Sequence, residues 1–362
     1  MSQSTGELVV YVGTYTQQLP HVYGKAEGIY VYRLDLASGA LRLQSAAGGV
    51  VNPSFVTVDP SRRFLYAVQE VGEYAGSPGG AASAFAIDGR SGDLTPINHQ
   101  PTHGAHPCYV SVDPTGRWLV TANYSGGSVT LLPIGEDGAL GAPAAVVQHE
   151  GPSRFHDGPH PHAAVPVGDF VLVPDCGLDR IYVYRLDGGR GALVPNEPPW
   201  AELAPAAGPR HLALHDRGYL YCINERGSTV TAFAYDRERG ALRELQTLST
   251  LPDGFEGRNA CADIHLHPSG RFLYGSNRGH DSIAVFTVDE ATGRLTAAGH
   301  VPTGGRTPRN FAVDPTGTYL LAANQDTDTI VSFRIDQATG ALHETGLVAA
   351  VPTPVCVHIV GG

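Results

Sequence analysis

Positive charge is scarce in this 362-residue chain, which has 24 lysines and arginines against 35 aspartates and glutamates and a net charge of −11. Proteins that bind nucleic acid or anionic membranes need a basic surface, so we expect neither as a partner. No apolar run reaches the roughly 18–20 residues that cross a bilayer. The first residues contain neither a positively charged segment nor a long apolar one. We therefore predict no signal peptide and a cytoplasmic protein.

Paired cysteines and nucleotide-binding motifs are also missing. The five cysteines are widely spaced, with no CxxC pair: Cys108, Cys176, Cys222, Cys261 and Cys356. Such spacing indicates neither a disulfide framework nor a zinc site. The chain contains no GxSxG elbow, P-loop or dinucleotide-binding glycine fingerprint, so a serine nucleophile has no support. We expect no cofactor and no bound metal.

Glycine and proline, by contrast, are abundant, at 45 and 27 residues with only one methionine. Both residues mark turns and interrupt helices, so the chain must turn often. One motif, a strand followed by a glycine-containing turn and a leucine, occurs seven times. Its copies end at Leu41, Leu94, Leu140, Leu193, Leu242, Leu295 and Leu342. The mean spacing of about 50 residues is typical of the four-stranded blade of a β-propeller.

A second repeated element, a short hairpin, precedes most of these turns. Its own turn contains Asp-Pro or a substitute, as at Asp113-Pro114, and residues 208–226 are another copy. Residues 8–16 resemble the second strand of this hairpin without a first, and residues 354–359 resemble a first strand without a second. We predict that these end segments pair and close a ring, which removes exposed sheet edges. The predicted fold is all-β, a single seven-bladed β-propeller domain over residues 1–362.

Repeat-equivalent positions predict where functional side chains meet. In a propeller the first strand of each blade lines the central channel and begins at the mouth where the second strand ends. The first strands begin at Ser54, Cys108, His162, Arg210, Ala262, Arg309 and Val355. The second strands end at Tyr15, Glu70, Tyr124, Cys176, Glu225, Arg278 and Gln325. Most of the charged and histidine side chains fall in four consecutive blades, and this asymmetry indicates a functional site.

Arginines at a narrow mouth are suited to bind anions, because a guanidinium offers paired donors to a carboxylate or phosphate. Arg210, Arg278 and Arg309 are the candidates, with Glu225 between them in sequence. The opposite charges should keep Glu225 ionised, and it is a candidate general base. The alternative is that Arg210 and Glu225 form a structural ion pair within one blade. Both interpretations can hold together.

The histidines offer a second source of acid–base chemistry. His160 and His162 form an HxH motif that would place both side chains on one face of a strand. We favour His162 as a general acid or base, because an imidazole titrates near neutrality. Zinc is an alternative, although no third ligand occurs at metal-like spacing. His149 and His156, in the long loop 143–159, are expected to be solvated.

Other polar residues near the same strand ends are candidates for substrate binding. They are His160, His211, Asp263, His265, Asn277, Arg309, Asn310 and Gln325. For Asp263 and His265, which begin another first strand, turn capping and hydrogen bonding between blades are the alternative. Asp179 and Asp281 precede third strands and are predicted to tie neighbouring blades together.

Three stretches of the chain carry a resemblance to a known family: GPRHLALH…YLYCINERGSTVTAFAYD, CADIHLHPSGRFLYGSNRGHDSIAVF and TPRNFAVDPTG…ANQDTDTIVSFRID. They resemble the seven-bladed propeller lactonases, a family that includes bacterial 6-phosphogluconolactonases and, more distantly, fungal carboxymuconate-lactonising enzymes. The resemblance covers nearly the whole chain and is densest from residue 159 to residue 336. It implies a mouth with one histidine, two arginines and one glutamate, which by motif fall on His162, Arg210, Arg278 and Glu225.

The resemblance also implies an activity. We expect hydrolysis of a sugar lactone, 6-phosphoglucono-1,5-lactone first, by a metal-independent enzyme of carbohydrate metabolism in the pentose phosphate pathway. Its arginines would hold the phosphate and the oxyanion, while Glu225 or His162 would activate water. The alternatives are a muconate-type lactonising or delactonising enzyme and a non-catalytic propeller scaffold. We expect a monomer or a weak homo-oligomer.

Overall fold

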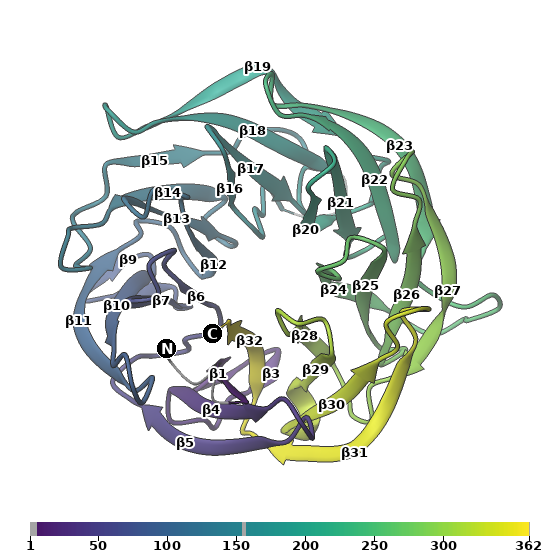
Figure 1. Cartoon of the computed structure of the whole chain (residues 1–362). Helices are drawn as coiled ribbons and strands as arrows, with labels where there is room; N and C mark the ends of the chain where they lie inside the picture. Colours follow the sequence, from purple (N-terminus) through teal and green to yellow (C-terminus); the bar gives the residue numbers. More distant parts are fainter. Residues whose placement is uncertain (1–5, 154–156, 362) are drawn as a thin grey trace.

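Each sequence repeat folds into a four-stranded antiparallel sheet, and seven such sheets stand in a ring in the computed structural model (Figure 1). The structure describes residues 6–153 and 157–361. Within each blade the strands run from the centre outward in the order first, second, third and fourth. The predicted seven-bladed β-propeller is confirmed.

The first four blades, each from the innermost strand outward, have these bounds. Blade 1 contains β32 (Pro354–Val360), β1 (Glu7–Thr14), β4 (Ile29–Asp35) and β5 (Leu41–Ala47). Blade 2 contains β6 (Val56–Val58), β7 (Phe64–Gln69), β10 (Ala81–Ile87) and β11 (Leu94–Pro101). Blade 3 contains β12 (Pro107–Val112), β13 (Trp118–Asn123), β14 (Ser128–Pro133) and β15 (Ala145–Gln148). Blade 4 contains β16 (Val165–Val167), β17 (Phe170–Asp175), β18 (Arg180–Asp187) and β19 (Ala192–Glu202).

The remaining blades repeat this plan. Blade 5 contains β20 (Pro209–His215), β21 (Tyr219–Asn224), β22 (Thr229–Asp236) and β23 (Ala241–Ser249). Blade 6 contains β24 (Ala260–Leu266), β25 (Phe272–Arg278), β26 (Ser282–Val288) and β27 (Leu295–Pro302). Blade 7 contains β28 (Pro308–Val313), β29 (Tyr319–Asn324), β30 (Thr329–Ile335) and β31 (Leu342–Ala350), with a short helix η1 (Gln325–Thr327) after β29. Two small hairpins, β2 (Gln18–Leu19) with β3 (Val22–Tyr23) and β8 (Glu73–Tyr74) with β9 (Ser77–Pro78), extend blades 1 and 2.

The two ends of the chain close the ring, as predicted. The last strand, β32, pairs antiparallel with the first, β1, so that Val10 lies opposite Ile359 and Val12 opposite Val357. The second strands are buried on both faces, and in β7 every side chain is buried. Apolar side chains therefore fill the space between neighbouring blades, and each of the seven blade-to-blade interfaces has its own buried cluster.

The turn between the third and fourth strands of each blade packs against the preceding blade. In blade 7, Gly340 has a left-handed φ of 74°, and a Cβ atom there would lie 2.5 Å from the ring of Phe272 in blade 6. The Tyr274 hydroxyl donates a 2.9 Å hydrogen bond to the Gly340 carbonyl. The equivalent glycines of the other turns are Gly39, Gly92, Gly138, Gly191, Gly240 and Gly293, and each faces a side chain of the blade before it.

Aspartates that precede some third strands tie neighbouring blades together, as predicted for Asp179 and Asp281. The Asp179 carboxylate accepts a 2.8 Å hydrogen bond from the Gly208 amide, and Asp281 accepts one of 2.9 Å from the Thr307 amide. Gly208 and Thr307 each lie two residues before an arginine at the channel mouth. These contacts therefore fix the backbone that presents Arg210 and Arg309.

We predict that replacing Gly340 with alanine destabilises the protein through the blade interface. A matched control exists at Gly346, which has a similar φ of 76° but no atom within 4 Å of the place that a Cβ would occupy. Gly346→Ala should cost about 1–2 kcal/mol of unfolding free energy from backbone strain alone. Gly340→Ala should cost roughly 1–3 kcal/mol more, because its methyl group collides with Phe272. Equal losses in denaturant unfolding would contradict this role of the turn.

Candidate active site

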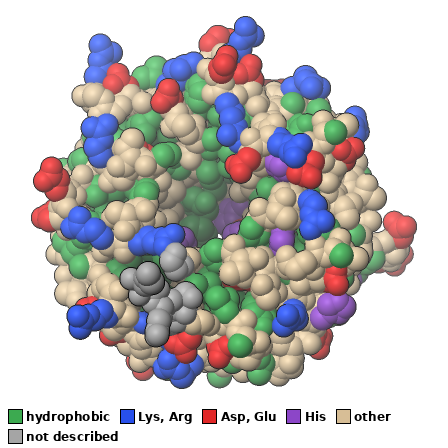
Figure 2. All heavy atoms as spheres, in the orientation of Figure 1, with side chains coloured by type: hydrophobic (Ala, Val, Ile, Leu, Met, Phe, Trp, Pro, Cys, Tyr) green, Lys and Arg blue, Asp and Glu red, His purple; other side chains and the backbone are tan. Residues whose placement is uncertain are grey.

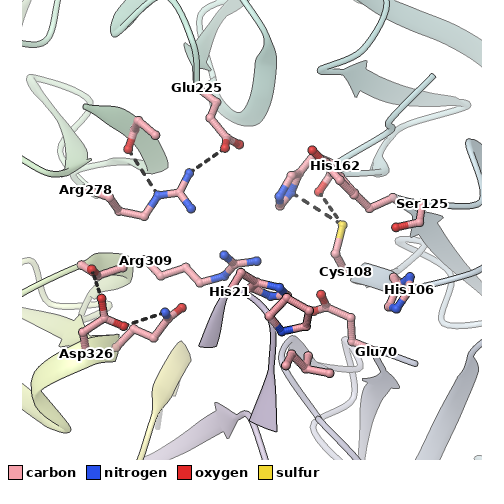
Figure 3. Close-up of a pocket in the computed structure, with 16 residues that line it drawn as sticks. His21, Glu70, His106, Cys108, Ser125, His162, Glu225, Arg278, Arg309 and Asp326 are labelled. Atoms are coloured by element: carbon pink, nitrogen blue, oxygen red, sulfur yellow. Dashed lines mark hydrogen bonds and ion pairs between the residues drawn. The ribbon is translucent and has the colours of Figure 1, made fainter. Parts of the chain in front are cut away.

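The inner strands begin and the second strands end around one mouth of the central channel. A pocket of about 680 Å³ lies there, shown in close-up in Figure 3. It contains Glu70, Cys108, Tyr124, His162, Glu225, Arg278, Arg309 and Gln325 from the two sequence-derived rings. Side chains of blades 2 to 7 therefore meet in one space. Most of the charged and histidine side chains that the sequence places in consecutive blades therefore lie on part of the pocket wall.

Glu225 is held between two guanidinium groups. Its Oε2 lies 3.1 Å from Nε of Arg210, and its Oε1 lies 2.9 Å from a terminal nitrogen of Arg278. Arg278 also donates hydrogen bonds to the carbonyls of Ala260 and Cys261, at 3.2 and 2.9 Å. Arg210 is almost completely buried, with 2% of its surface exposed, and lies beneath the pocket floor rather than in the pocket wall. The ion pair within blade 5, which the sequence offered as the alternative interpretation, is present, and Arg278 extends it into blade 6.

This arrangement determines the charge state of the cluster. Burial would raise the pKa of Glu225, but Arg278, Arg210 and Arg309 together hold it at about 2. Burial and the neighbouring Arg278 lower the pKa of Arg210 to about 10, so it keeps its charge at neutral pH. Glu225 is thus ionised, as predicted. Its two oxygens, each occupied by a guanidinium, are poorly placed to accept a proton.

A second carboxylate, Glu70, faces the pocket from blade 2. Its Oε2 accepts a 2.8 Å hydrogen bond from the Tyr15 hydroxyl and a short one from the Ser54 hydroxyl. The Tyr15 oxygen in turn accepts a hydrogen bond from Arg309 at 3.2 Å. Arg309 and Glu70 are therefore linked through Tyr15 and not in direct contact. Glu70 belongs to the ring of second-strand ends in the repeat alignment, but it is not one of the predicted site residues.

His162 faces the pocket across from Arg278 (Figure 3). Its Nδ1 lies 3.7 Å from the Cys108 sulfur, and its ring meets that of Tyr124 edge-on at 5.4 Å. Burial and the positive charge of Arg210 lower the pKa of His162 well below its usual value. The imidazole is therefore neutral at physiological pH. A neutral ring can accept or donate one hydrogen bond to a bound molecule.

The β2–β3 hairpin supplies a wall that the repeat alignment did not identify. It places Leu19, Pro20 and His21 along the pocket. Lys25, two residues after this hairpin, forms an ion pair of 2.5 Å with Asp328 of blade 7 and so attaches the hairpin to that blade. The signal in the sequence was the long connection between the second and third strands of blade 1, which has no equivalent in most blades.

Four predicted site residues lie deeper in the channel, outside the main pocket. Asp263 bridges two histidines, with His211 Nδ1 at 2.7 Å and His265 Nε2 at 2.9 Å, and it also accepts a hydrogen bond from Asn310. All four line a separate pocket of about 350 Å³. Histidine side chains also gather in the central hollow of the face drawn in Figure 2. None of the four lines the main pocket, although His211 and Asn310 share the narrow space below it with His162 and Arg309.

The pKa values in this deeper network follow from its contacts. Burial would raise the pKa of Asp263, but His265 and His211 hold it far below the ordinary value. Burial and Arg210 lower the pKa of His211 to about 4, so that ring is neutral. Burial opposes the charge on His265, yet Asp263 raises its pKa. One terminal nitrogen of Arg210 lies 3.4 Å from Nε2 of His211, so the deeper network also contacts the Arg210 guanidinium.

Three further predicted residues have other surroundings. His160 stacks on Tyr124, with ring centroids 4.5 Å apart, and its Nδ1 contacts the Tyr124 carbonyl at 2.9 Å, away from the pocket. Asn277 is buried between strands, where its amide nitrogen donates to the Thr250 carbonyl at 2.8 Å. Gln325 does line the pocket, and its Oε1 is buried without a hydrogen-bond partner in the described chain.

One expectation about the long loop is wrong. His149 is not solvated: it is 2% exposed, and its Nδ1 lies 2.7 Å from the buried Asp175 carboxylate. The physical reason is that the Asp175 carboxylate is buried and both of its oxygens need partners. Oδ1 accepts backbone hydrogen bonds from residues 160, 177 and 178, and His149 is the partner of Oδ2. His156 lies outside the described residues.

Neither a metal-binding cluster nor a membrane-spanning helix occurs among the described residues. Between residues 6–153 and 157–361, no group of three or more histidine, cysteine, aspartate or glutamate side chains has an arrangement that could hold a metal ion. Across the same ranges, no helix is both long and apolar enough to cross a membrane.

Comparisons with known proteins agree with this architecture. The profile of the family described as "Lactonase, 7-bladed beta-propeller" matches residues 9–359. A 6-phosphogluconolactonase of Bacillus subtilis is 40% identical over 309 residues, which cover 84% of each chain. One of Formosa agariphila is 33% identical over 84% of this chain and 86% of its own. The solved structure of a periplasmic gluconolactonase from Pseudomonas aeruginosa is 35% identical, with a TM-score of 0.91 over 98% of this chain and 99% of the other.

The neutral, buried His211 predicts a pH dependence of stability. Its pKa is about 4 in the fold and about 6.5 in the unfolded chain, so the unfolded state binds more protons between these values. Stability from this group is complete above about pH 6.5 and falls with pH by up to about 1.4 kcal/mol per unit toward pH 4. His211→Asn, which keeps a donor for Asp263, should flatten this slope in denaturant unfolding, whereas the same change at exposed His343 is the control. An unchanged slope would contradict the assignment.

Proposed function

This chain belongs to the seven-bladed β-propeller lactonase family, and we propose that it hydrolyses a sugar lactone, with 6-phosphoglucono-1,5-lactone as the preferred substrate. The observation that carries this proposal is the convergence of Arg278, Arg309 and a neutral His162 on one pocket of about 680 Å³. That volume is in the range typical of small-molecule sites. The names of the relatives in Bacillus subtilis and Pseudomonas aeruginosa support the substrate class.

Arg309 is the principal anion-binding residue of this proposal. Within the described residues, its guanidinium makes one hydrogen bond, to the Tyr15 hydroxyl, and it contacts no carboxylate directly. A guanidinium has five N–H donors, so most of them remain available to a phosphate or carboxylate. Arg278 shares its charge with Glu225 but still lines the pocket. We assign it to the lactone carbonyl oxygen, where negative charge develops as water adds.

His162 is the better supported of the two residues predicted to activate water. The pKa of about 2 and the two guanidinium contacts leave Glu225 little basicity, so its role is to hold Arg210 and Arg278 in place. His162 is uncharged and faces the same space. In our proposal it orients the attacking water. Water then adds to the carbonyl carbon, the ring C–O bond breaks, and a hydroxy acid leaves.

The substrate assignment is tested with three lactones and one pair of variants. We expect the highest kcat/KM with 6-phosphogluconolactone, a lower value with gluconolactone and the lowest with a muconolactone. Arg309→Ala should lower kcat/KM for the phosphorylated substrate by about 10–100-fold, since charge-assisted hydrogen bonds contribute about 1.5–3 kcal/mol. Arg306→Ala, at an exposed position outside the pocket, is the control. Absence of hydrolysis with all three lactones would rule out the proposed function.

The low pKa of His162 predicts an unusual acid limb in the pH–rate profile. A histidine with an ordinary pKa would lose its lone pair to protonation as the pH falls through about 6.5. Burial and Arg210 keep His162 neutral below that value, so kcat/KM should not decline between pH 7.5 and about 6. Rates corrected for spontaneous lactone hydrolysis measure this. A decline centred near pH 6.5 that disappears in His162→Gln would contradict the assigned charge state.

A further inference from the structure

We propose that Glu70 is a further catalytic residue, which takes a proton from the attacking water and returns it to the ring oxygen of the opened lactone. The inference rests on the proposed hydrolysis and deepens it. None of the roles assigned above uses Glu70, although it lines the main pocket and the narrow space below it. In the close-up it lies on the same side of the pocket as Cys108, apart from the Glu225–Arg278 pair (Figure 3).

Glu70 and Glu225 occupy equivalent positions in their repeats, but their contacts differ. Each comes directly after the second strand of its blade, β7 or β21. Both oxygens of Glu225 contact a guanidinium. At Glu70 only Oε2 is engaged, by the hydroxyls of Tyr15 and Ser54, and Oε1 has no hydrogen-bond partner among the described residues. Glu70 therefore keeps one oxygen free of contacts with the described residues, whereas each oxygen of Glu225 already contacts a guanidinium.

The surroundings of Glu70 also hold it in position. It is 6% exposed, and its backbone amide donates a 3.1 Å hydrogen bond to the Asn52 carbonyl. Two hydroxyl groups on one oxygen restrict the carboxylate to one orientation. Through Tyr15, that orientation is connected to Arg309, the proposed anion-binding residue. Glu70 and Arg309 are thus linked parts of the wall of one pocket.

His162 cannot easily take the place of Glu70 as the proton acceptor. The burial and the Arg210 charge that keep His162 neutral also oppose formation of an imidazolium. His162 can hold a water molecule by a hydrogen bond, but its low pKa makes it a weak proton acceptor. A carboxylate, by contrast, becomes neutral when it accepts a proton, so the transfer creates no new buried positive charge.

The proposed step balances without any further reactant. The water oxygen forms a bond to the lactone carbonyl carbon, and one water proton passes to Oε1 of Glu70. When the tetrahedral intermediate collapses, the bond between the carbonyl carbon and the ring oxygen breaks. The ring oxygen leaves with the electron pair and takes the proton back from Glu70. Glu70 is regenerated as a carboxylate, and the product is the hydroxy acid.

The test compares Glu70→Gln and Glu70→Ala with the wild-type enzyme in a lactonase assay corrected for spontaneous hydrolysis. Glutamine retains the acceptor for Tyr15 but cannot take a proton, so kcat should fall by roughly 10²–10⁴-fold while KM changes little. Added formate should raise the kcat of Glu70→Ala by at least about tenfold, as expected when a small acid replaces a missing general base, and should not accelerate the wild-type enzyme. Glu73→Gln in the exposed part of β8 is the matched control.

Each outcome decides the proposal. A folded Glu70→Gln variant that keeps more than about a tenth of the wild-type kcat overturns the proposal, because general-base catalysis contributes a larger factor than that. A loss of activity that is confined to a higher KM also overturns it. A fall in kcat that formate does not restore in a folded Glu70→Ala variant also overturns the role of proton acceptor. Thermal unfolding and binding of 6-phosphogluconate confirm that the variants are folded. A wild-type enzyme that hydrolyses no lactone refutes the proposed function itself and is thereby distinguished from failure of this inference.

Discussion

The antiparallel pairing of β32 with β1 is the interaction on which the rest of the structure depends. It joins residues near the two ends of the chain, such as Val10 and Ile359, and turns an open row of sheets into a closed ring. Closure makes every blade a neighbour of two others, so each second strand is buried on both faces. It also directs all seven inner strands toward one axis. Side chains separated by hundreds of residues, such as Tyr15 and Arg309, then come within hydrogen-bonding distance.

The closed ring places charge where water cannot easily compensate it. A buried Arg210 would be costly alone, and Glu225 offsets that cost within the same blade. The carboxylate is shared with Arg278 of the next blade, so the ion pair also connects two blades at the channel mouth. Arg309 has no such direct partner in the described chain and remains available to a ligand. The arginines that are paired with Glu225 and the arginine that is proposed to bind a ligand therefore lie in the same region. They differ in whether a carboxylate of the protein already contacts them.

Adjacent positions on one inner strand serve different parts of the channel. Successive side chains of a strand point to opposite faces, so neighbouring residues can line different pockets, although Arg210 and His211 still share the narrow space below the main pocket. Arg210 contacts Glu225 at the mouth, while its neighbour His211 contacts Asp263 in the deeper network. Arg309 likewise lines the main pocket and Asn310 the deeper one, while both line the narrow space below the main pocket. Proximity in sequence therefore assigned His211 and Asn310 to a pocket that they do not line.

The sequence by itself determined the architecture, because a repeat of about 50 residues and two incomplete end segments leave few alternatives to a closed seven-bladed ring. It also placed Arg210 and Glu225 at one end of the same hairpin, where the alternative interpretation of an ion pair applies and the structure shows one. Only the tertiary structure decided which carboxylate keeps a free oxygen. Tyr15 of blade 1 contacts Glu70 of blade 2, and Arg278 of blade 6 contacts Glu225 of blade 5. A repeat alignment contains no distances between blades, so it cannot show these contacts.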